Sequence, residues 1–261
     1  MTTTAIARAL PLGFMLGADP ELFVYRGDNP VSAHDLIPGT KANPYAVPGG
    51  AIQVDGTAAE FNINPAKTFD EFNDNIETVL QHLQEYLPDD CYLRPQSVVV
   101  WDSEYFETLP YTAIELGCMP DFDAWTGRRN PKPKLKSSPT LRTAAGHIHI
   151  GFTENADCQD MQHILAAQEM IKLMDWHVGT WSCDADPDKI RRSLYGKAGA
   201  CRYKTYGVEY RTLSNFWVMD YDLRLAVWNR TVDACEEFAS GMRRDWSENT
   251  VHEITSYING E

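Results

Sequence analysis

The sequence predicts an α+β fold in which an antiparallel sheet has one face buried under helices and the other face open. Two observations lead to this prediction. The segments with strand-like alternation are half polar, which is typical of antiparallel strands covered on one side only. Between them lie segments with the apolar spacing of amphipathic helices. At 261 residues, the chain is expected to form a single domain over 1–261 with one full core.

Alternating polar and apolar residues mark six segments as predicted strands. They cover residues 17–25, 51–64, 97–101, 112–117, 146–152 and 208–214. The segment GHIHIGF shows the pattern most clearly, because His147 and His149 share one face while Ile148, Ile150 and Phe152 share the other. The apolar face can enter a core. The two imidazoles then point together toward the open side of the sheet.

The first predicted helix covers residues 68–87 and carries its own start and stop signals. Thr68 and Glu71 have the spacing of a capping box, and Pro88 ends the helix. The apolar residues that recur along one face are Phe69, Phe72, Ile76, Leu80, Leu83 and Leu87. This periodicity predicts a helix that packs one side against a core.

Three more helices and one long loop complete the predicted elements. The helices are expected to begin near Asp157, Asp220 and Ser247. The segment 121–139 is rich in proline and basic residues, so we expect it to be a long loop at the rim of a site.

The composition argues against several classes of protein. No stretch approaches the roughly 20 apolar residues of a membrane span, and the N-terminal residues make a poor secretory signal. The six cysteines form no C-x-x-C pair, which argues against a zinc knuckle and favours a reducing cytoplasm. The net charge of −14 argues against nonspecific binding of nucleic acid.

Two basic clusters stand out in this acidic chain. Residues 128–142 hold six basic and no acidic residues, and residues 191–211 hold six basic residues against one acid. The second cluster offers several hydrogen-bond donors for the oxygens of a polyphosphate. The alternative interpretation is that both clusters are simply solvated loops. Neither a P-loop nor a dinucleotide-binding glycine pattern occurs. A bound nucleotide would therefore be held by metal ions and arginines.

The same alternation places charged residues on the open face of four predicted strands. They are Asp19 and Glu21, Glu60, His147 and His149, and Glu209 and Arg211. Taken alone, the carboxylate and arginine patterns are more often the solvated side of a strand, and a histidine pair is as often a satisfied polar pair as a site. Taken together, several carboxylates that face one space repel one another unless cations lie between them. Carboxylates with few histidines suit Mg²⁺ or Mn²⁺ better than zinc.

Five motifs follow one another along the chain: GADPELF, VDGTAAEFNINPA, LGCMPDFDAWTG, GHIHIGF and YGVEYRTLSNFW. Their order resembles the carboxylate–amine ligases of the glutamine synthetase and glutamate–cysteine ligase superfamily, and their content is most similar to the phage COOH-NH2 ligase family, type 2. The resemblance runs from about Leu16 to Trp217. It implies a curved antiparallel sheet that forms a funnel of the glutamine synthetase-like type, with helices packed on the outer face. ATP and acceptor would enter from opposite ends, with Mg²⁺ or Mn²⁺ between them.

The resemblance and the open-face pattern together assign roles to individual residues. The expected metal ligands are Glu21, Glu60, His147, Glu209 and Asp19. The expected nucleotide-binding residues are Arg191, Lys197, Arg202, Lys204, Arg211 and His149. The expected catalytic residues are Arg211, Glu209 and Arg202, with Arg211 contacting the phosphate that is transferred.

The chain departs from the better-known members at its first acidic motif. Asp19 and Glu21 stand where those proteins have two glutamates, and Asp55 could supply the missing ligand. Asp121, Asp123 and Trp125 are expected to line the acceptor pocket, although simple packing is the plainer interpretation for Trp125.

The leading hypothesis is an ATP-dependent ligase that forms an amide through an acyl phosphate and releases ADP and phosphate. Its expected partners are a small-molecule or peptide carboxylate and an amine, and neither nucleic acid nor a membrane is expected to bind. The expected location is the cytoplasm, which is the host cytoplasm if a phage encodes the protein. The oligomeric state is left open. Two alternatives remain. One is a metal-dependent hydrolase that uses the histidines and carboxylates, and the other is a phage binding protein that keeps the fold without the chemistry.

Overall fold

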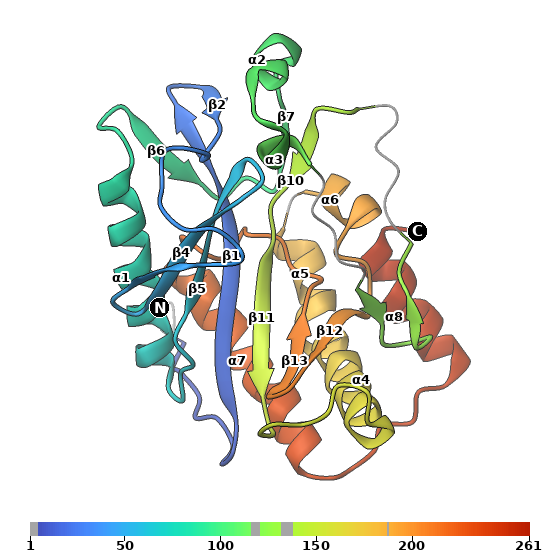
Figure 1. The fold of residues 1–261 in the computed structure, drawn as a ribbon. Helices are drawn as coiled ribbons and strands as arrows, with labels where there is room; N and C mark the ends of the chain where they lie inside the picture. Colours follow the sequence, from blue (N-terminus) through green and yellow to red (C-terminus); the bar gives the residue numbers. More distant parts are fainter. Residues whose placement is uncertain (1–4, 116–120, 132–137, 187) are drawn as a thin grey trace.

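The computed structural model describes residues 5–115, 121–131, 138–186 and 188–261. Figure 1 shows a large sheet with helices packed behind it. All strand pairs of this sheet are antiparallel, which confirms the predicted α+β class and the antiparallel sheet. The sheet is open, because β3 and β9 lie at opposite ends of the described strand order and do not pair with each other.

The main sheet contains 11 strands in the order β3-β4-β5-β1-β11-β13-β12-β8-β9, with β2 and β6 pairing to β1. These strands are β1 (Met15–Arg26), β2 (Asn29–Val31), β3 (Tyr45–Val47), β4 (Gly50–Asp55), β5 (Ala58–Ile63), β6 (Cys91–Arg94), β8 (Phe122–Asp123), β9 (Arg128–Arg129), β11 (Gly146–Gly151), β12 (Ala200–Lys204) and β13 (Gly207–Tyr210). A separate two-stranded sheet pairs β7 (Val98–Val100) with β10 (Leu141–Thr143).

The helices are α1 (Phe69–Tyr86), α2 (Ser103–Thr108), α3 (Tyr111–Ile114), α4 (Met161–Met174), α5 (Thr180–Ala185), α6 (Ile190–Leu194), α7 (Tyr221–Ala239) and α8 (Glu248–Asn259). The four predicted helices correspond to α1, α4, α7 and α8, and the capping box of α1 is present. Among the described residues, no helix combines the length and apolar character needed to cross a membrane.

Four details of the predicted elements are wrong. The segment 51–64, expected to be a strand, forms the hairpin of β4 and β5. The segment 112–117 is predicted to be a strand, but Tyr111–Ile114 form the short helix α3, whose first turn closes on the carbonyl of Pro110; residues 116 and 117 lie outside the described residues. The strand expected over 208–214 ends at Tyr210. The loop expected over 121–139 contains the short paired strands β8 and β9 in its described part. Each error concerns an element of six residues or fewer, where pairing partners outweigh the local pattern.

The core lies between the apolar face of the sheet and the helices. α1 contacts β4 and β5, α4 contacts β12 and β13, and α7 packs against both helices. Leu22, Ile148 and Val208 are buried on this face of three neighbouring strands. Because strand side chains alternate, burying these residues turns the charged neighbours to the opposite face. The packing of the core therefore decides which way the polar residues point.

A buried acid ties the helical layer to the strands that carry the site. Asp175 opens a π-helical turn (η1, Asp175–Gly179) after α4 and is fully buried. Its carboxylate accepts hydrogen bonds from Trp125 Nε1 (2.7 Å), the Gly199 amide (2.6 Å) and the Tyr210 hydroxyl (2.8 Å). Gly179 lacks the Cβ that would lie 2.5 Å from that hydroxyl. Burial outweighs these bonds and raises the pKa of Asp175 to about 7.

The raised pKa of Asp175 predicts a pH-dependent contribution to stability. The folded protein holds the proton of the Asp175 carboxyl group more tightly than the unfolded chain does. The stability that this proton contributes is therefore fully present below about pH 4 and is lost as pH rises through about 7. An Asp175→Asn variant cannot titrate there and keeps the packing. Relative to wild type, its free energy of unfolding should rise by about 2 kcal/mol between pH 5 and pH 8, as measured by denaturant unfolding.

The control for this measurement is Asp74→Asn, which changes an exposed acid on α1. Its stability difference from wild type should stay nearly constant over the same pH range. Parallel stability curves for wild type and Asp175→Asn would contradict the assigned role of Asp175.

Candidate metal and nucleotide site

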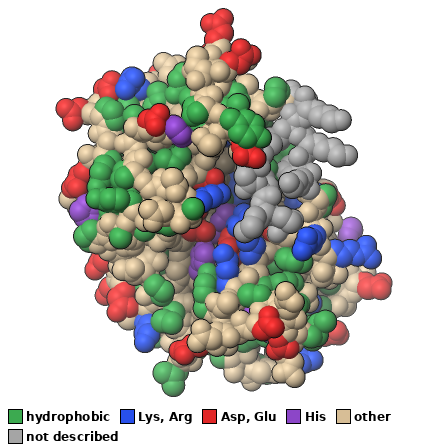
Figure 2. All heavy atoms as spheres, viewed as in Figure 1, with side chains coloured by type: hydrophobic (Ala, Val, Ile, Leu, Met, Phe, Trp, Pro, Cys, Tyr) green, Lys and Arg blue, Asp and Glu red, His purple; other side chains and the backbone are tan. Residues whose placement is uncertain are grey.

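A cavity of about 780 Å³ opens on the polar face of the sheet. Figure 2, in the same view as Figure 1, shows acidic, basic and histidine side chains gathered in a hollow at the centre of this face. The charged residues on its wall include Asp19, Glu21, Glu60, Arg202, Lys204 and Arg211. Of the residues predicted from strand alternation, this wall includes Asp19, Glu21, Glu60, His147 and Arg211, but not His149 or Glu209.

The register of the strands explains why these residues meet. Asp19 on β1 lies opposite His147 on β11, and His149 on β11 lies opposite Glu209 on β13. Glu21 on β1 lies opposite Glu60 on β5. Directly opposed residues in an antiparallel pair point to the same face. Asp19, Glu21, Glu60 and His147 thus reach the cavity from β1, β5 and β11, and Glu209 lies on the same face of the sheet.

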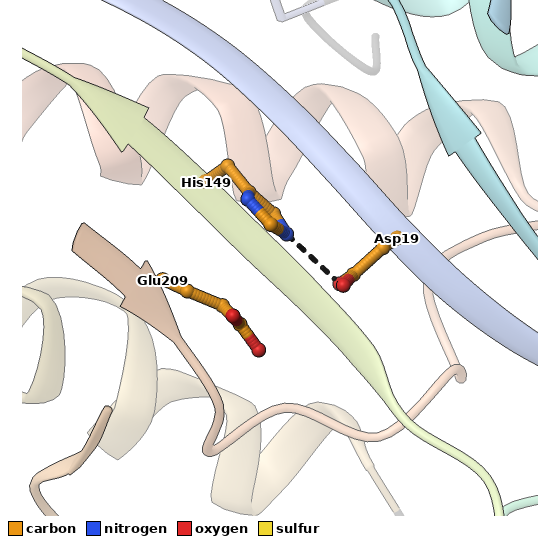
Figure 3. A group of neighbouring side chains, drawn as sticks. All are labelled: Asp19, His149 and Glu209. Atoms are coloured by element: carbon orange, nitrogen blue, oxygen red, sulfur yellow. Dashed lines mark ion pairs between the residues drawn. The ribbon is translucent and has the colours of Figure 1, made fainter. Parts of the chain in front are cut away.

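Asp19, His149 and Glu209 form the first acidic group, with potential ligand atoms all within 4.8 Å of one another. Figure 3 shows these side chains converging from β1, β11 and β13. His149 Nε2 lies 3.0 Å from Asp19 Oδ1. His147 Nδ1 lies 3.1 Å from the same oxygen and 3.6 Å from Glu209 Oε1. Both predicted histidines thus contact Asp19, but His149 completes the three-residue group.

Basic side chains surround Glu209, which is fully buried. Lys204 Nζ lies 2.7 Å from Glu209 Oε2, Arg202 lies 3.7 Å from Oε1, and Arg211 forms an ion pair with Oε1. Burial and the Asp19 carboxylate oppose ionisation of Glu209. The charges of Arg211 and the two histidines outweigh them and lower its pKa to about 2. The first acidic group therefore lies in surroundings rich in positive charge.

Glu21, Asp55 and Glu60 form the second acidic group, again with ligand atoms within 4.8 Å of one another. Burial and the nearby Asp55 carboxylate raise the pKa of Glu21 to about 7. Burial and the carboxylates of Asp19 and Glu21 raise the pKa of Glu60 well above its ordinary value. These three acids repel one another, so a cation placed among them would stabilise their charged forms. Asp55, the additional ligand suggested by the sequence, belongs to this group.

The donor chemistry of both groups fits Mg²⁺ or Mn²⁺. The first offers two carboxylates and one imidazole, and the second offers three carboxylates. Hard cations of this kind prefer oxygen ligands, whereas structural zinc sites use mainly cysteine and histidine. The five cysteines among the described residues are free thiols and belong to neither group.

Two residues expected to bind the nucleotide, Arg191 and Lys197, lie on the cavity wall but also support the backbone. The buried Arg191 guanidinium donates to the carbonyls of Thr212 (2.9 Å) and Arg211 (3.3 Å). The Lys197 carbonyl accepts a hydrogen bond from the Thr212 hydroxyl at 3.0 Å. Arg191 therefore holds the segment that carries Arg211.

The three residues expected in the acceptor pocket have different surroundings. Asp121 lines the cavity and lies 3.6 Å from Arg211 Nε. Asp123 accepts hydrogen bonds from the Trp125 amide and the Thr126 hydroxyl. Trp125 donates to Asp175 and packs edge-on against Trp246. Asp121 alone of the three is part of the cavity wall.

Sequence reasoning missed three residues at the site. Lys41 Nζ lies 2.5 Å from Asp55 Oδ2, Gln53 donates to Glu60 at 2.7 Å, and the Tyr206 hydroxyl contacts His149. Gln53 shares the face of Asp55 by strand alternation, so that pattern could have identified it. Lys41 and Tyr206 lie outside the strands, where alternation gives no signal.

No protein-family model and no curated protein sequence matches this chain.

The position of Lys41 predicts that it weakens cation binding at the second acidic group. A Lys41→Met variant keeps most of the side-chain length but removes the positive charge beside Asp55. Because the pair is partly exposed, we expect Mn²⁺ to bind up to about fivefold more tightly in this variant, as measured by calorimetry. The control is Lys67→Met, which removes an exposed lysine elsewhere. A gain that persists when Glu60→Gln is added would contradict this assignment.

Proposed function

We propose that this protein is an ATP-dependent carboxylate–amine ligase of the glutamine synthetase-like type, in which residues 1–261 form one domain and the open sheet face forms the funnel. The observation that carries the proposal is that two acidic groups lie at one cavity, with Arg202, Lys204 and Arg211 on its wall and paired with the buried Glu209 of the first group. The order of motifs along the chain, which resembles the phage COOH-NH2 ligase family, supports the same assignment. We place the reaction in the cytoplasm.

The two acidic groups would hold divalent cations, whose charge would help to offset the negative charge that develops during phosphoryl transfer. Asp19, His149 and Glu209 would hold one cation, and Glu21, Asp55 and Glu60 another. His147 contacts Asp19 and Glu209 and orients both carboxylates. Arg202 and Lys204 lie beside Glu209, where they can donate to phosphate oxygens.

The reaction has two steps. A carboxylate oxygen of the first substrate attacks the γ-phosphorus of ATP, the bond to the bridging oxygen breaks, and ADP leaves with that electron pair. Arg211, whose guanidinium lies between Glu209 and Asp121, stabilises the negative charge on the transferring group. The amine then attacks the acyl carbon, phosphate leaves, and the amine gives up a proton as the amide forms.

The basic residues favour this reaction over metal-dependent hydrolysis. A hydrolase of an uncharged substrate would use the carboxylates and histidines to activate water and would leave the three basic side chains around Glu209 without a role. Their position next to a metal-binding group suits a polyphosphate substrate.

The proposal predicts that an Arg211→Gln variant loses phosphoryl transfer. ATP labelled with ¹⁸O at the β,γ-bridge should undergo positional isotope exchange with Mg²⁺ and a suitable carboxylate, because acyl phosphate formation is reversible while ADP stays bound. A panel of carboxylates identifies the substrate by ³¹P NMR. Losing the arginine should slow exchange by about 1000-fold.

The control for this experiment is Arg26→Gln, which removes an exposed arginine from the far end of β1. It should exchange at the wild-type rate. Full exchange in Arg211→Gln would contradict the proposed role of Arg211. Absence of Mg²⁺-dependent ATP binding in wild type would contradict the ligase assignment as a whole.

A further inference from the structure

Tyr206 lies in the turn between β12 and β13 and contacts the site through one histidine. Its hydroxyl forms a hydrogen bond with His149 Nδ1, and the two rings are tilted by 30° with centroids 5.9 Å apart. His149 belongs to the first acidic group, whereas Tyr206 does not. The His149 imidazole is therefore the member of that group with which Tyr206 forms a hydrogen bond.

The backbone fixes this tyrosine to the strand that carries His149. The Tyr206 carbonyl accepts hydrogen bonds from the amides of Phe152 (2.9 Å) and Thr153 (3.1 Å), directly after β11. Gly207 follows with φ of 148°, and a Cβ there would lie 2.2 Å from the Ile150 carbonyl oxygen. The turn thus packs closely against the end of β11. A rigid turn holds the hydroxyl at a constant position relative to His149.

The two nitrogens of His149 have different neighbours. Nδ1 faces Tyr206, while Nε2 lies 3.0 Å from Asp19 Oδ1 and faces the first acidic group. Gly17 lies opposite His149 on β1, and its missing side chain leaves room beside the imidazole. The side chain of His149 is only 18% exposed, so its ring orientation is set by these contacts.

We infer that Tyr206 is a positioning residue that holds the His149 imidazole with Nε2 toward Asp19 and Glu209 and accepts a hydrogen bond from Nδ1–H when Nε2 binds a divalent cation. This inference rests on the proposed metal site. A neutral imidazole carries one proton, so a nitrogen that binds a cation through its lone pair requires the proton on the other nitrogen. A hydroxyl can donate or accept, so Tyr206 can serve both the cation-free and the cation-bound state.

Removing such a partner weakens metal binding without removing a ligand. Partners that orient a metal-binding histidine typically contribute about 10- to 100-fold to metal affinity. A Tyr206→Phe variant keeps the ring and the turn but loses the hydroxyl. We expect the affinity of this variant for Mn²⁺ to fall by about 10- to 100-fold. The affinity is measured by electron paramagnetic resonance in the presence of ADP. Both the variant and its parent carry Glu60→Gln, which removes one carboxylate of the second acidic group.

The matched control is Tyr203→Phe in the same hairpin. The Tyr203 hydroxyl accepts a hydrogen bond from Gln168 at 3.0 Å and has no contact with His149 among the interactions described. This variant also loses one tyrosine hydroxyl, but its Mn²⁺ affinity should equal that of its Glu60→Gln parent. Equal losses in the two variants would assign the effect to the hairpin and overturn the inference.

A second measurement reads the proton directly. The protein is labelled with ¹⁵N-histidine and saturated with Mg²⁺ and ADP. Long-range ¹H–¹⁵N spectra should then show the imidazole proton of His149 on Nδ1. The His149 signal is assigned by its loss in His149→Gln. Tyr206→Phe should populate both tautomers. An unchanged tautomer together with unchanged Mn²⁺ affinity would overturn the role of Tyr206 and leave the ligase proposal standing.

Failure of the proposed metal site gives a different result. If Mn²⁺ does not bind to wild type with ADP, the metal site is wrong and the inference about Tyr206 is overturned with it. If Mn²⁺ binds to wild type and His149→Gln has no effect, the cation lies elsewhere and the role of Tyr206 is again overturned.

Discussion

The pairing register of β1, β11 and β13 is the constraint on which the rest of the structure depends. In these strands a shift of one residue would turn Asp19, His149 and Glu209 into the core and Leu22, Ile148 and Val208 toward water. The apolar face, buried against α1, α4 and α7, prevents such a shift. The same hydrophobic packing that stabilises the fold therefore aligns the charged groups of the site.

Placing several charged side chains close together raises the free energy of the folded protein. The structure offsets this increase differently at the first and the second acidic group. Around Glu209, three basic side chains balance the negative charge. Around Glu21 and Glu60, Lys41 lies beside the group through its contact with Asp55, and burial raises the pKa of both acids. The first acidic group is therefore balanced by basic neighbours, whereas the second is balanced mainly by protons that its acids retain. In the proposed ligase, a cation bound to the second group would displace these protons.

Buried polar contacts outside the cavity hold the segments that carry the site. Arg191 binds the carbonyls that follow β13, and Asp175 joins η1 to Gly199 and to Tyr210 on β13. Unpaired polar groups at these positions would be expensive, since each is buried. A site built on neighbouring strands and supported in this way changes shape little, which suits a reaction that depends on positioning charges.

The sequence alone determined which strand residues share the polar face of the sheet and where α1 begins. Alternation separated His147 and His149 from Ile148 and Ile150, and the capping box placed the start of α1, because both signals come from residues close together in the chain. Tertiary structure decided the rest. Strand order and register determined that His149, rather than His147, completes the group with Asp19 and Glu209. Lys41 and Tyr206 reach the site from segments without periodicity, and pairing with β12 decided the short strand β8 at Phe122. These features depend on contacts between residues far apart in the chain, which no local pattern encodes.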